Sequence, residues 1–346
     1  MLNRDELLQL MKATAKADPV APVAYSFGGE NLSYEAMNET LRRELNELAG
    51  NYALYRENKN LIFSLIEETI DEVLPKKVEE NYSQFAEVKT YAQGDKPIFK
   101  RPAINRSRAK QFITRVGLAG IYEVFKLAKE RPFELQTSAV GGAAQIGFEE
   151  FLDGHVDFAE VTRIVMEGID ELIYREIAKA FMSSINQLPA ANQAAVPGFD
   201  EAAMDRLIMV ASQYGQPTIY CTYEFAVKML PSRDWVSDAM KDERWNKGYF
   251  TTYKGTRVVI MPQGFEDESN EKKVIDPGYC WIIPTGFEKP VKVAFEGATI
   301  VDEWANKDRS REIQVYKKVG VGVIMSPDIC VYQDTELLGQ MDVLPQ

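Results

Sequence analysis

Residues 155–188 read HVDFAEVTRIVMEGIDELIYREIAKAFMSSINQL, the longest uninterrupted helical pattern in the chain. Asp157 and Glu160 have the spacing of a capping box, and Val156 can pack onto Val161 as a hydrophobic staple. Both signals place the start of the helix at Asp157. About 30 residues predict a rod of roughly 45 Å, with Gly168 as a place for a bend. One apolar stripe at three-and-four spacing predicts the buried face: Val161, Ile164, Val165, Ile169, Leu172, Ile173, Ile177, Ala180, Phe181 and Ile185.

The composition is that of a folded, soluble protein that does not coat nucleic acid. The 346 residues are 45% apolar and 27% charged, enough for two domains or one elaborate domain. A formal charge of −12 argues against general nucleic-acid binding, which needs a basic surface. The chain has neither a signal peptide nor an apolar run of roughly 20 residues, so we expect synthesis in the cytoplasm and no membrane span.

The first 80 residues predict an arm followed by two helices. Residues 1–32 are polar and mixed, with prolines and glycines, and predict a loosely packed lead-in. Ser33 and Gly50 can cap a helix that lies between them. A second helical pattern, NLIFSLIEETIDEVL at 60–74, should stop at Pro75.

Residues 82–117 predict a long two-stranded hairpin or an extended loop around a turn at Gly94 and Asp95. No acid occurs between Asp95 and Glu123, so residues 96–122, called the basic segment below, carry only basic charges. A free-standing arm of this charge would dock on an acidic surface, and a solvated basic face is an equal alternative. Phe99 and Phe112 are too few and too far apart for a nucleic-acid stacking platform. The candidate contact residues are Lys96, Lys100, Arg101, Arg106, Arg108, Lys110 and Arg115.

The second half of the chain predicts an α/β unit that follows a linker. FELQTSAVGGAAQIGFEEFLDG at 133–154 is strand-like at both ends, with small residues between. LPAANQAAVPGF at 188–199 is a small-residue and proline linker, the best candidate for a domain boundary. Residues 199–303 alternate an amphipathic helix with buried strands. The stretch at 311–334 predicts a long strand that breaks at Ser326 and Pro327 and then resumes.

The chain lacks the short motifs on which catalysis or cofactor binding usually depends. Its only histidine, His155, is expected in a turn rather than in a catalytic site. Cys221, Cys280 and Cys330 are far apart and odd in number, which predicts buried thiols in a reducing compartment. The glycines near 141 and 320 predict strand packing rather than a phosphate loop. We therefore expect no catalytic residue, cofactor or metal.

In their order, the lead-in, basic arm, long helix, linker, α/β unit and returning strand resemble the major capsid proteins of tailed bacteriophages, which have the Hong Kong 97-type fold. The resemblance covers roughly residues 80–335 and depends on the order and character of the elements. It implies an α+β chain with a partly helical N-terminal arm at 1–80 and an E-loop at 81–118. It also implies a peripheral domain with the spine helix at 119–196 and 304–325, and an α/β axial domain at 197–303 and 326–346.

The resemblance implies a structural function rather than an enzymatic one. Hexamers and pentamers of the chain would form an icosahedral head shell in the host cytoplasm, enclosing DNA without sequence-specific contacts. Scaffolding, portal and decoration proteins would be further partners, and no membrane or cofactor is implied. Two alternatives stay open: an encapsulin-like compartment shell, and a carboxylate-dependent α/β enzyme centred on 199–303.

Overall fold

The computed structural model describes residues 2–17, 25–27, 30–101, 131–146, 158–229, 237–261, 263–265, 269, 273–285, 289–305, 311–324 and 326–338. Contacts divide them into two compact units. The first comprises the described parts of Met1–Phe99, Pro132–Glu176 and Val291–Gly322, and the second those of Lys100–Arg131, Ile177–Pro290 and Val323–Gln346. None of the helices in these stretches is long and apolar enough to cross a membrane.

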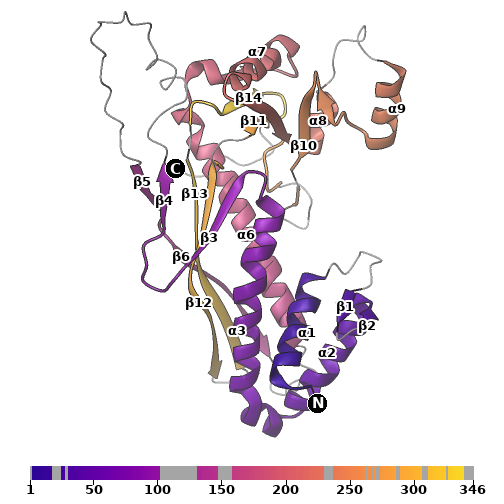
Figure 1. Ribbon diagram of the computed structural model, residues 1–346, viewed down its shortest axis with the longest axis vertical. Coiled ribbons are helices and arrows are strands. Elements are labelled where there is room, and N and C mark those ends of the chain that lie inside the picture. Colours follow the sequence, from indigo (N-terminus) through magenta and orange to yellow (C-terminus); the bar gives the residue numbers. More distant parts are fainter. Residues whose placement is uncertain are drawn as a thin grey trace, which may run out of the picture. The chain divides into compact units, whose positions relative to one another are not determined.

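Three helices open the first unit, α1 (Arg4–Lys16), α2 (Tyr34–Ala49) and α3 (Tyr52–Tyr82), with a short hairpin of β1 (Tyr25–Phe27) and β2 (Glu30–Leu32). Figure 1 shows α1 and α2 beside α3. The helix predicted from Ser33 to Gly50 is confirmed, and Ser33 caps it. The expectation of a loosely packed lead-in is wrong for α1. Asn3 and Glu6 form a capping box there, and one face of α1 is buried, including Leu7, Leu10 and Met11.

The prediction that a helix stops at Pro75 is also wrong, because α3 runs through this proline to Tyr82. A proline inside a helix costs about 3 kcal/mol, since it removes one hydrogen bond and crowds the preceding turn. Beyond it, however, Val78 and Tyr82 are buried, and the Tyr82 ring stacks on Tyr174 at 5.6 Å. Burying each large side chain contributes roughly 1.5–3 kcal/mol, so packing of the last two turns offsets the proline.

The sheet of the first unit has four strands in the order β3-β12-β13-β6. They are Ala86–Tyr91, Val291–Ala305, Arg311–Val323 and Ser138–Ile146. β6 runs through the small residues that were expected to separate two strands, and Gly141 is required there. A Cβ at Gly141 would lie 2.2 Å from the carbonyl oxygen of Val315 on β13. The prediction of strand-packing glycines is therefore confirmed at this position.

Helix α3 takes the place of a strand where β3 ends. β3 pairs in parallel with β12 only as far as Glu296. Farther along, the backbone amide of Thr299 donates to Asp71 at 2.8 Å, and that of Val301 donates to Glu67 at 2.9 Å. Glu67 and Asp71 are four positions apart on the helix, which separates them by about 6 Å along its axis. The amides of Thr299 and Val301 are about 6.6 Å apart along the strand, so each carboxylate lies opposite one amide. They cover an edge that would otherwise be open to pairing.

The predicted hairpin at 82–117 does not form within the described residues. Its turn is present: Gly94 has a φ of 87°, and the Asp95 amide donates to the Ala92 carbonyl at 3.1 Å. The strands on either side belong to different sheets, because β3 pairs with β12 whereas β4 (Ile98–Arg101) pairs with β5 (Arg131–Glu134). Residues 102–130, between β4 and β5, lie outside the described residues.

The long helix is confirmed as α6 (Phe158–Ser184), followed by a 3-10 turn at Ile185–Gln187. His155 and the expected cap Asp157 lie outside the described residues. Only part of the predicted stripe is buried. Met166, Ile169 and Ile173 define the buried face, whereas Ile164 is 56% exposed and Leu172 is 37% exposed. The apolar residues span more of the helix circumference than the described parts of the chain cover.

The second unit is the α/β unit expected from the sequence. Its sheet has the order β7-β14-β11-β8-β10-β9, with three helices. The strands are Gln193–Val196, Cys330–Asp334, Tyr279–Thr285, Gln216–Cys221, Thr256–Ile260 and Thr252–Tyr253, and the helices are α7 (Glu201–Ser212), α8 (Tyr223–Lys228) and α9 (Asp238–Lys247). β13 and β14 confirm the strand that breaks and resumes. The three cysteines are free and buried, on adjacent strands, as expected.

The segment at 188–199, expected to be a linker, contains a short 3-10 turn (Ala190–Asn192) and strand β7. β7 pairs in parallel with β14. The Asn192 side chain donates to the carbonyl oxygens of Pro327 at 2.7 Å and Ile329 at 2.8 Å. These long-range hydrogen bonds order a segment whose composition alone resembles a linker. The division between the compact units falls earlier, after Glu176 within α6.

Candidate assembly surface

The predicted contact residues lie on and beyond the strand β4. Lys96 precedes β4, Lys100 lies on it with an exposed side chain, and Arg101 is its last residue. Lys96 is exposed and pairs with Glu134 of β5 at 2.8 Å, and this hydrogen bond raises the pKa of Lys96. The other four predicted residues lie outside the described residues: Arg106, Arg108, Lys110 and Arg115.

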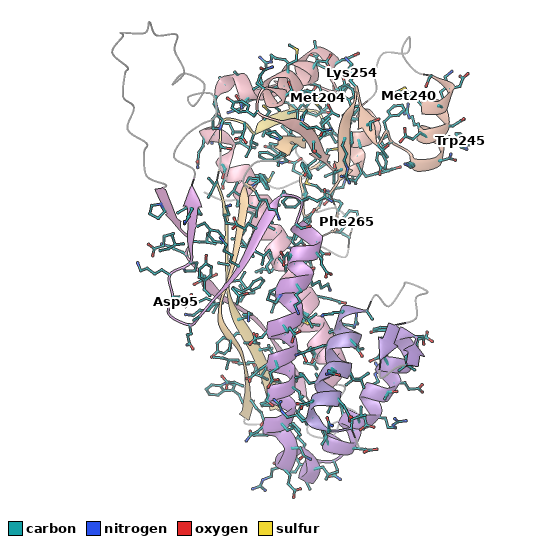
Figure 2. The ribbon with its side chains drawn as sticks, viewed as in Figure 1. Asp95, Met204, Met240, Trp245, Lys254 and Phe265 are labelled. Atoms are coloured by element: carbon teal, nitrogen blue, oxygen red, sulfur yellow. The ribbon has the colours of Figure 1, made fainter. Side chains whose placement is uncertain are left out.

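The base of the basic segment is fixed by a small apolar cluster. Phe99 of β4 is fully buried and packs with Leu135 and Ala294, while Tyr91 and Phe133 pack against them. The amide of Leu135 also donates to the carbonyl oxygen of Pro97 at 2.9 Å. Figure 2 shows Asp95 in the turn that leads into this base. The two strands that start and end the segment are therefore held together and against the sheet.

Two lysines lie over the Phe99 ring. The amines of Lys89 and Lys292 are 5.0 Å and 5.7 Å from the ring centre, within range of cation–π attraction. Lys292 is fully buried and pairs with Glu87, which also pairs with Lys89 at 2.6 Å. Burial alone would raise the pKa of Glu87, but the hydrogen bonds from Lys292 and Lys89 hold it below its ordinary value. The carboxylate thus keeps both cations beside the ring.

Glu296, on β12, connects the residues on both sides of the basic segment. Its carboxylate accepts hydrogen bonds from the Thr137 hydroxyl and from the Gly94 amide at 3.2 Å, and it pairs with Lys318 at 3.1 Å. The bond from Thr137, followed by those from Lys318 and Gly94, lowers the pKa of Glu296 to about 2. Gly94 precedes β4 and Thr137 follows β5. One charged side chain therefore ties both ends of the basic segment to the sheet.

Several large apolar side chains remain on the surface of the described residues. In the first unit these include Ile164 and Leu172 of α6, one above the other with Gly168 between them. In the second unit Met209 and Trp245 are the most exposed. Isolated apolar residues on a surface are ordinary, but a tryptophan or methionine that is mostly exposed is typical of a contact surface.

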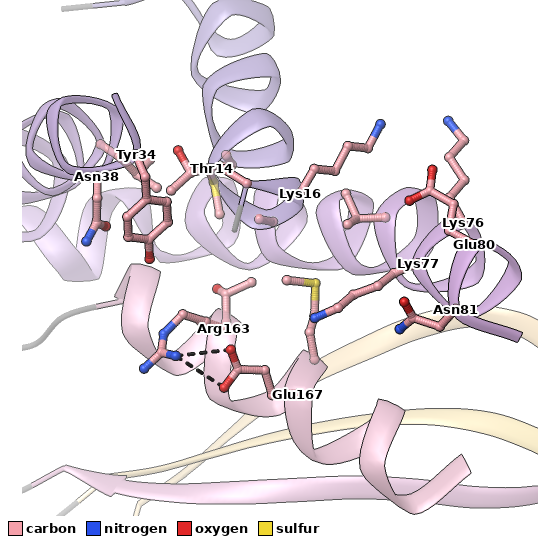
Figure 3. A pocket seen from close by; sticks show the side chains of 17 residues that line it. Thr14, Lys16, Tyr34, Asn38, Lys76, Lys77, Glu80, Asn81, Arg163 and Glu167 are labelled. Carbon is pink, nitrogen blue, oxygen red and sulfur yellow. Dashed lines mark hydrogen bonds and ion pairs between the residues drawn. The ribbon is translucent and has the colours of Figure 1, made fainter. Parts of the chain in front are cut away.

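The described residues contain no arrangement that points to catalysis or metal binding. No group of three or more His, Cys, Asp and Glu side chains among them could hold a metal ion. A cavity of about 430 Å³ lies between α1, α2, α3 and the first turns of α6. Figure 3 shows Lys77 reaching along it and Arg163 paired with Glu167. The wall carries both signs of charge, with Lys76 and Lys77 beside Glu80, and therefore selects no single class of ligand.

Comparison with known proteins gives one match that spans nearly the whole chain. A family model described as "SPbeta prophage-derived putative capsid protein YonB" matches residues 6–333. No curated protein matches the chain.

Solved structures give more distant similarities. The satellite phage P4 procapsid with its size determination protein is 10% identical, covering 76% of this chain and 90% of that chain, with a TM-score of 0.49. The capsid of cyanophage P-SCSP1u is also 10% identical, covering 73% and 86%, with a TM-score of 0.47. The holo-SrpI encapsulin complex from Synechococcus elongatus is 11% identical, covering 73% and 88%, with a TM-score of 0.40.

Proposed function

This chain belongs to the YonB family of prophage-derived capsid proteins, and from that premise we propose that it is the major capsid subunit of a phage head. The expectation of a capsid protein, a structural component of the virion and not an enzyme, is confirmed by the family match. Hexamers and pentamers of the chain would build a closed icosahedral shell around the phage DNA. The prophage origin of the family favours this function over a cellular compartment shell.

The elements support an assignment to the parts of a Hong Kong 97-type subunit. The segment that leaves the sheet at β4 and returns at β5 is the E-loop, and α6 is the spine helix. The four-stranded sheet of the first unit is the peripheral domain. The six-stranded sheet of the second unit is the axial domain. The residues up to about 80 form the N-terminal arm. Within it, α1 and α2 pack onto α3.

The basic segment is the part of the subunit that reaches a neighbour. The observation that carries this proposal is its base: Phe99 and Glu296 fix both ends of the segment, while Lys96 and Lys100 stay exposed. A fixed base lowers the entropy that docking would otherwise cost. The chain as a whole carries a charge of −12, so a neighbouring copy offers acidic surface to a run of cations.

Charge reversal in the basic segment tests this proposal. Replacing Lys100, Arg101, Arg106 and Arg108 with glutamate should prevent assembly, as seen by electron microscopy and sedimentation, while circular dichroism shows a folded subunit. A matched control makes the same change in net charge at four exposed cations of the helices: Arg42, Arg43, Arg56 and Lys179. This control should still assemble. Shells from the first variant at the wild-type concentration would refute docking by the basic segment.

A further inference from the structure

Two of the three cysteines lie directly opposite each other in the sheet of the second unit. In the antiparallel register of β8 and β11, Cys221 pairs with Cys280. Both are free thiols, and both side chains are fully buried. Side chains of opposite residues point to the same face of a sheet, and here that face belongs to the core that contains Leu207 of α7. The two thiols are therefore neighbours within one core.

The backbone hydrogen bonds show which kind of pair the cysteines form. The Cys221 carbonyl accepts from the amide of Met261, just after β10, at 2.9 Å. Since the N–H and C=O of one strand residue point to the same edge, the backbone of Cys221 faces β10 and not β11. On the other strand, the Gly278 carbonyl accepts from Asp334 of β14 at 2.8 Å, and Cys280, two residues later, faces the same edge. The cysteines thus form a non-hydrogen-bonded pair, the kind whose side chains are closer.

This pair meets the distance requirement of a disulfide. Opposite Cα atoms in a non-hydrogen-bonded pair are about 4.5 Å apart, and disulfides join Cα atoms that are about 4.4–6.8 Å apart. Burial, followed by the hydrogen bond between the two thiols, raises the pKa of Cys280. The thiols are thus already in contact, and a bond between the sulfurs requires only rotation of the two side chains.

Cys330 lies in the same core but outside this distance. It is opposite Ile282 on β11, which makes it a diagonal neighbour of Cys280. Diagonal neighbours lie about 7–8 Å apart, beyond the reach of a disulfide unless the backbone moves. Strand β11 also separates Cys330 from Cys221. Of the pairs that the cysteines allow, only Cys221 with Cys280 fits a disulfide.

We propose that Cys221 and Cys280 form a disulfide when the capsid leaves the reducing cytoplasm, and that this bond stabilises the second unit. The inference depends on the proposed function, because a released particle passes from a reducing to an oxidising environment. The bond would close the chain between the two cysteines, which contains α8, α9, β9 and β10, into a covalent loop. Closing a loop restricts the unfolded chain, so the oxidised unit should be more stable than the reduced one.

The oxidant is hydrogen peroxide, and the reaction balances with it. The sulfur of one cysteine attacks an oxygen of the peroxide, the O–O bond breaks, and the proton of the thiol completes a molecule of water, which leaves a sulfenic acid. The second thiol attacks that sulfur, the S–O bond breaks, and a second water leaves. Because both thiols are buried near the ends of their strands, the reaction requires local opening of those ends and is slow.

Counting thiols by mass spectrometry tests the pairing. The reduced native protein is incubated with hydrogen peroxide and then unfolded in a maleimide that labels every remaining thiol. Wild type should lose two labels together and keep one, which peptide mapping should place on Cys330. The matched control Cys330→Ala should lose both of its labels at the wild-type rate. Cys221→Ala should form no disulfide within the chain.

Refolding gives the oxidant access to thiols that are buried in the native protein. The reduced chain is unfolded in urea and refolded in a mixture of oxidised and reduced glutathione, and its thiols are counted in the same way. A bond between Cys221 and Cys280 after either treatment supports the pairing. Three labels after both treatments would overturn it, and so would a disulfide that includes Cys330 or oxidation of the two sulfurs to sulfonic acids.

Thermal unfolding tests the stabilisation and separates this inference from the proposed function. Oxidised wild type should unfold several degrees above reduced wild type, whereas Cys221→Ala should show no such shift. Equal unfolding temperatures for the two wild-type forms would refute the stabilisation. All these measurements use the unassembled subunit, so a disulfide in a protein that never assembles would refute the proposed function and not the pairing. Shells that assemble from a protein that never forms the bond would refute the inference alone.

Discussion

The ion pair between Lys317 and Asp71 should be much more sensitive to loss of the acid than to loss of the base. Lys317 of β13 is 1% exposed and pairs with Asp71 of α3, whose side chain is 32% exposed. Asp71 also accepts hydrogen bonds from the amide and the hydroxyl of Thr299, at 2.8 Å and 2.5 Å. Asp71→Asn keeps an acceptor for Thr299 but leaves a buried ammonium without its counter-charge, which should cost about 3–5 kcal/mol.

Lys317→Met should cost far less. The remaining carboxylate is partly in water and keeps both hydrogen bonds from Thr299, so we expect a loss of about 1 kcal/mol or less. The double variant should then be close to Lys317→Met alone, because it leaves no buried charge unpaired. Urea denaturation of the unassembled subunit measures all three. A larger loss in Lys317→Met than in Asp71→Asn would refute this reasoning, and so would additive losses in the double variant.

Three further predictions concern the carboxylate of Glu296, the proline in helix α3 and the three thiols. The lowered pKa of Glu296 contributes stability that is complete above the ordinary pKa of 4.5 and is lost as pH falls towards 2. The difference in urea stability between wild type and Glu296→Gln should therefore shrink over that range. A difference that stays constant with pH would contradict the role of Glu296 in holding the basic segment. Pro75→Ala should raise the stability of the subunit by about 1–3 kcal/mol in the same assay, because it restores a backbone amide that can bond within the helix. A loss of stability in this variant would contradict that account of the proline. The three thiols should resist a maleimide at pH 8 until the chain is unfolded, since they are buried and burial raises the pKa of Cys330 to about 12. Rapid labelling of the native subunit would show that solvent reaches the core of the second unit.

Local signals in the sequence predicted most of the elements. Ser33 and the periodic apolar residues of the long helix act within a few positions, so they can be found without knowledge of the fold. The capping box of α1 is a signal of the same kind: Asn3 and Glu6 have the right spacing before an apolar stripe, and they could have identified the helix. The polar character of residues 1–32 concealed it.

Features that depend on distant residues could not be predicted. Pro75 is tolerated because the turns beyond it pack against α6, more than 80 residues later in the chain. The segment that contains β7 has the composition of a linker. It is ordered by hydrogen bonds from Asn192 to Pro327 and Ile329, which no local pattern shows. The partners of β3 and β4 likewise lie in β12 and β5, outside the segment that suggested a hairpin.

The candidate assembly surface divides in the same way. The basic run was visible because seven cations without an acid stand out in a chain of net charge −12. Its anchor was not visible, because Glu296 is one of 52 acids and its role depends on contacts with Gly94 and Thr137. The exposed Trp245 gave no signal either, since an amphipathic pattern does not show which apolar residues stay outside the core.

Electron microscopy of the purified protein tests the central claim most directly. A capsid subunit should form closed shells, tubes or separate rings of copies as its concentration is raised, alone or with a scaffolding protein. A protein that stays strictly monomeric at high concentration under both conditions would contradict the claim that this chain builds a phage head.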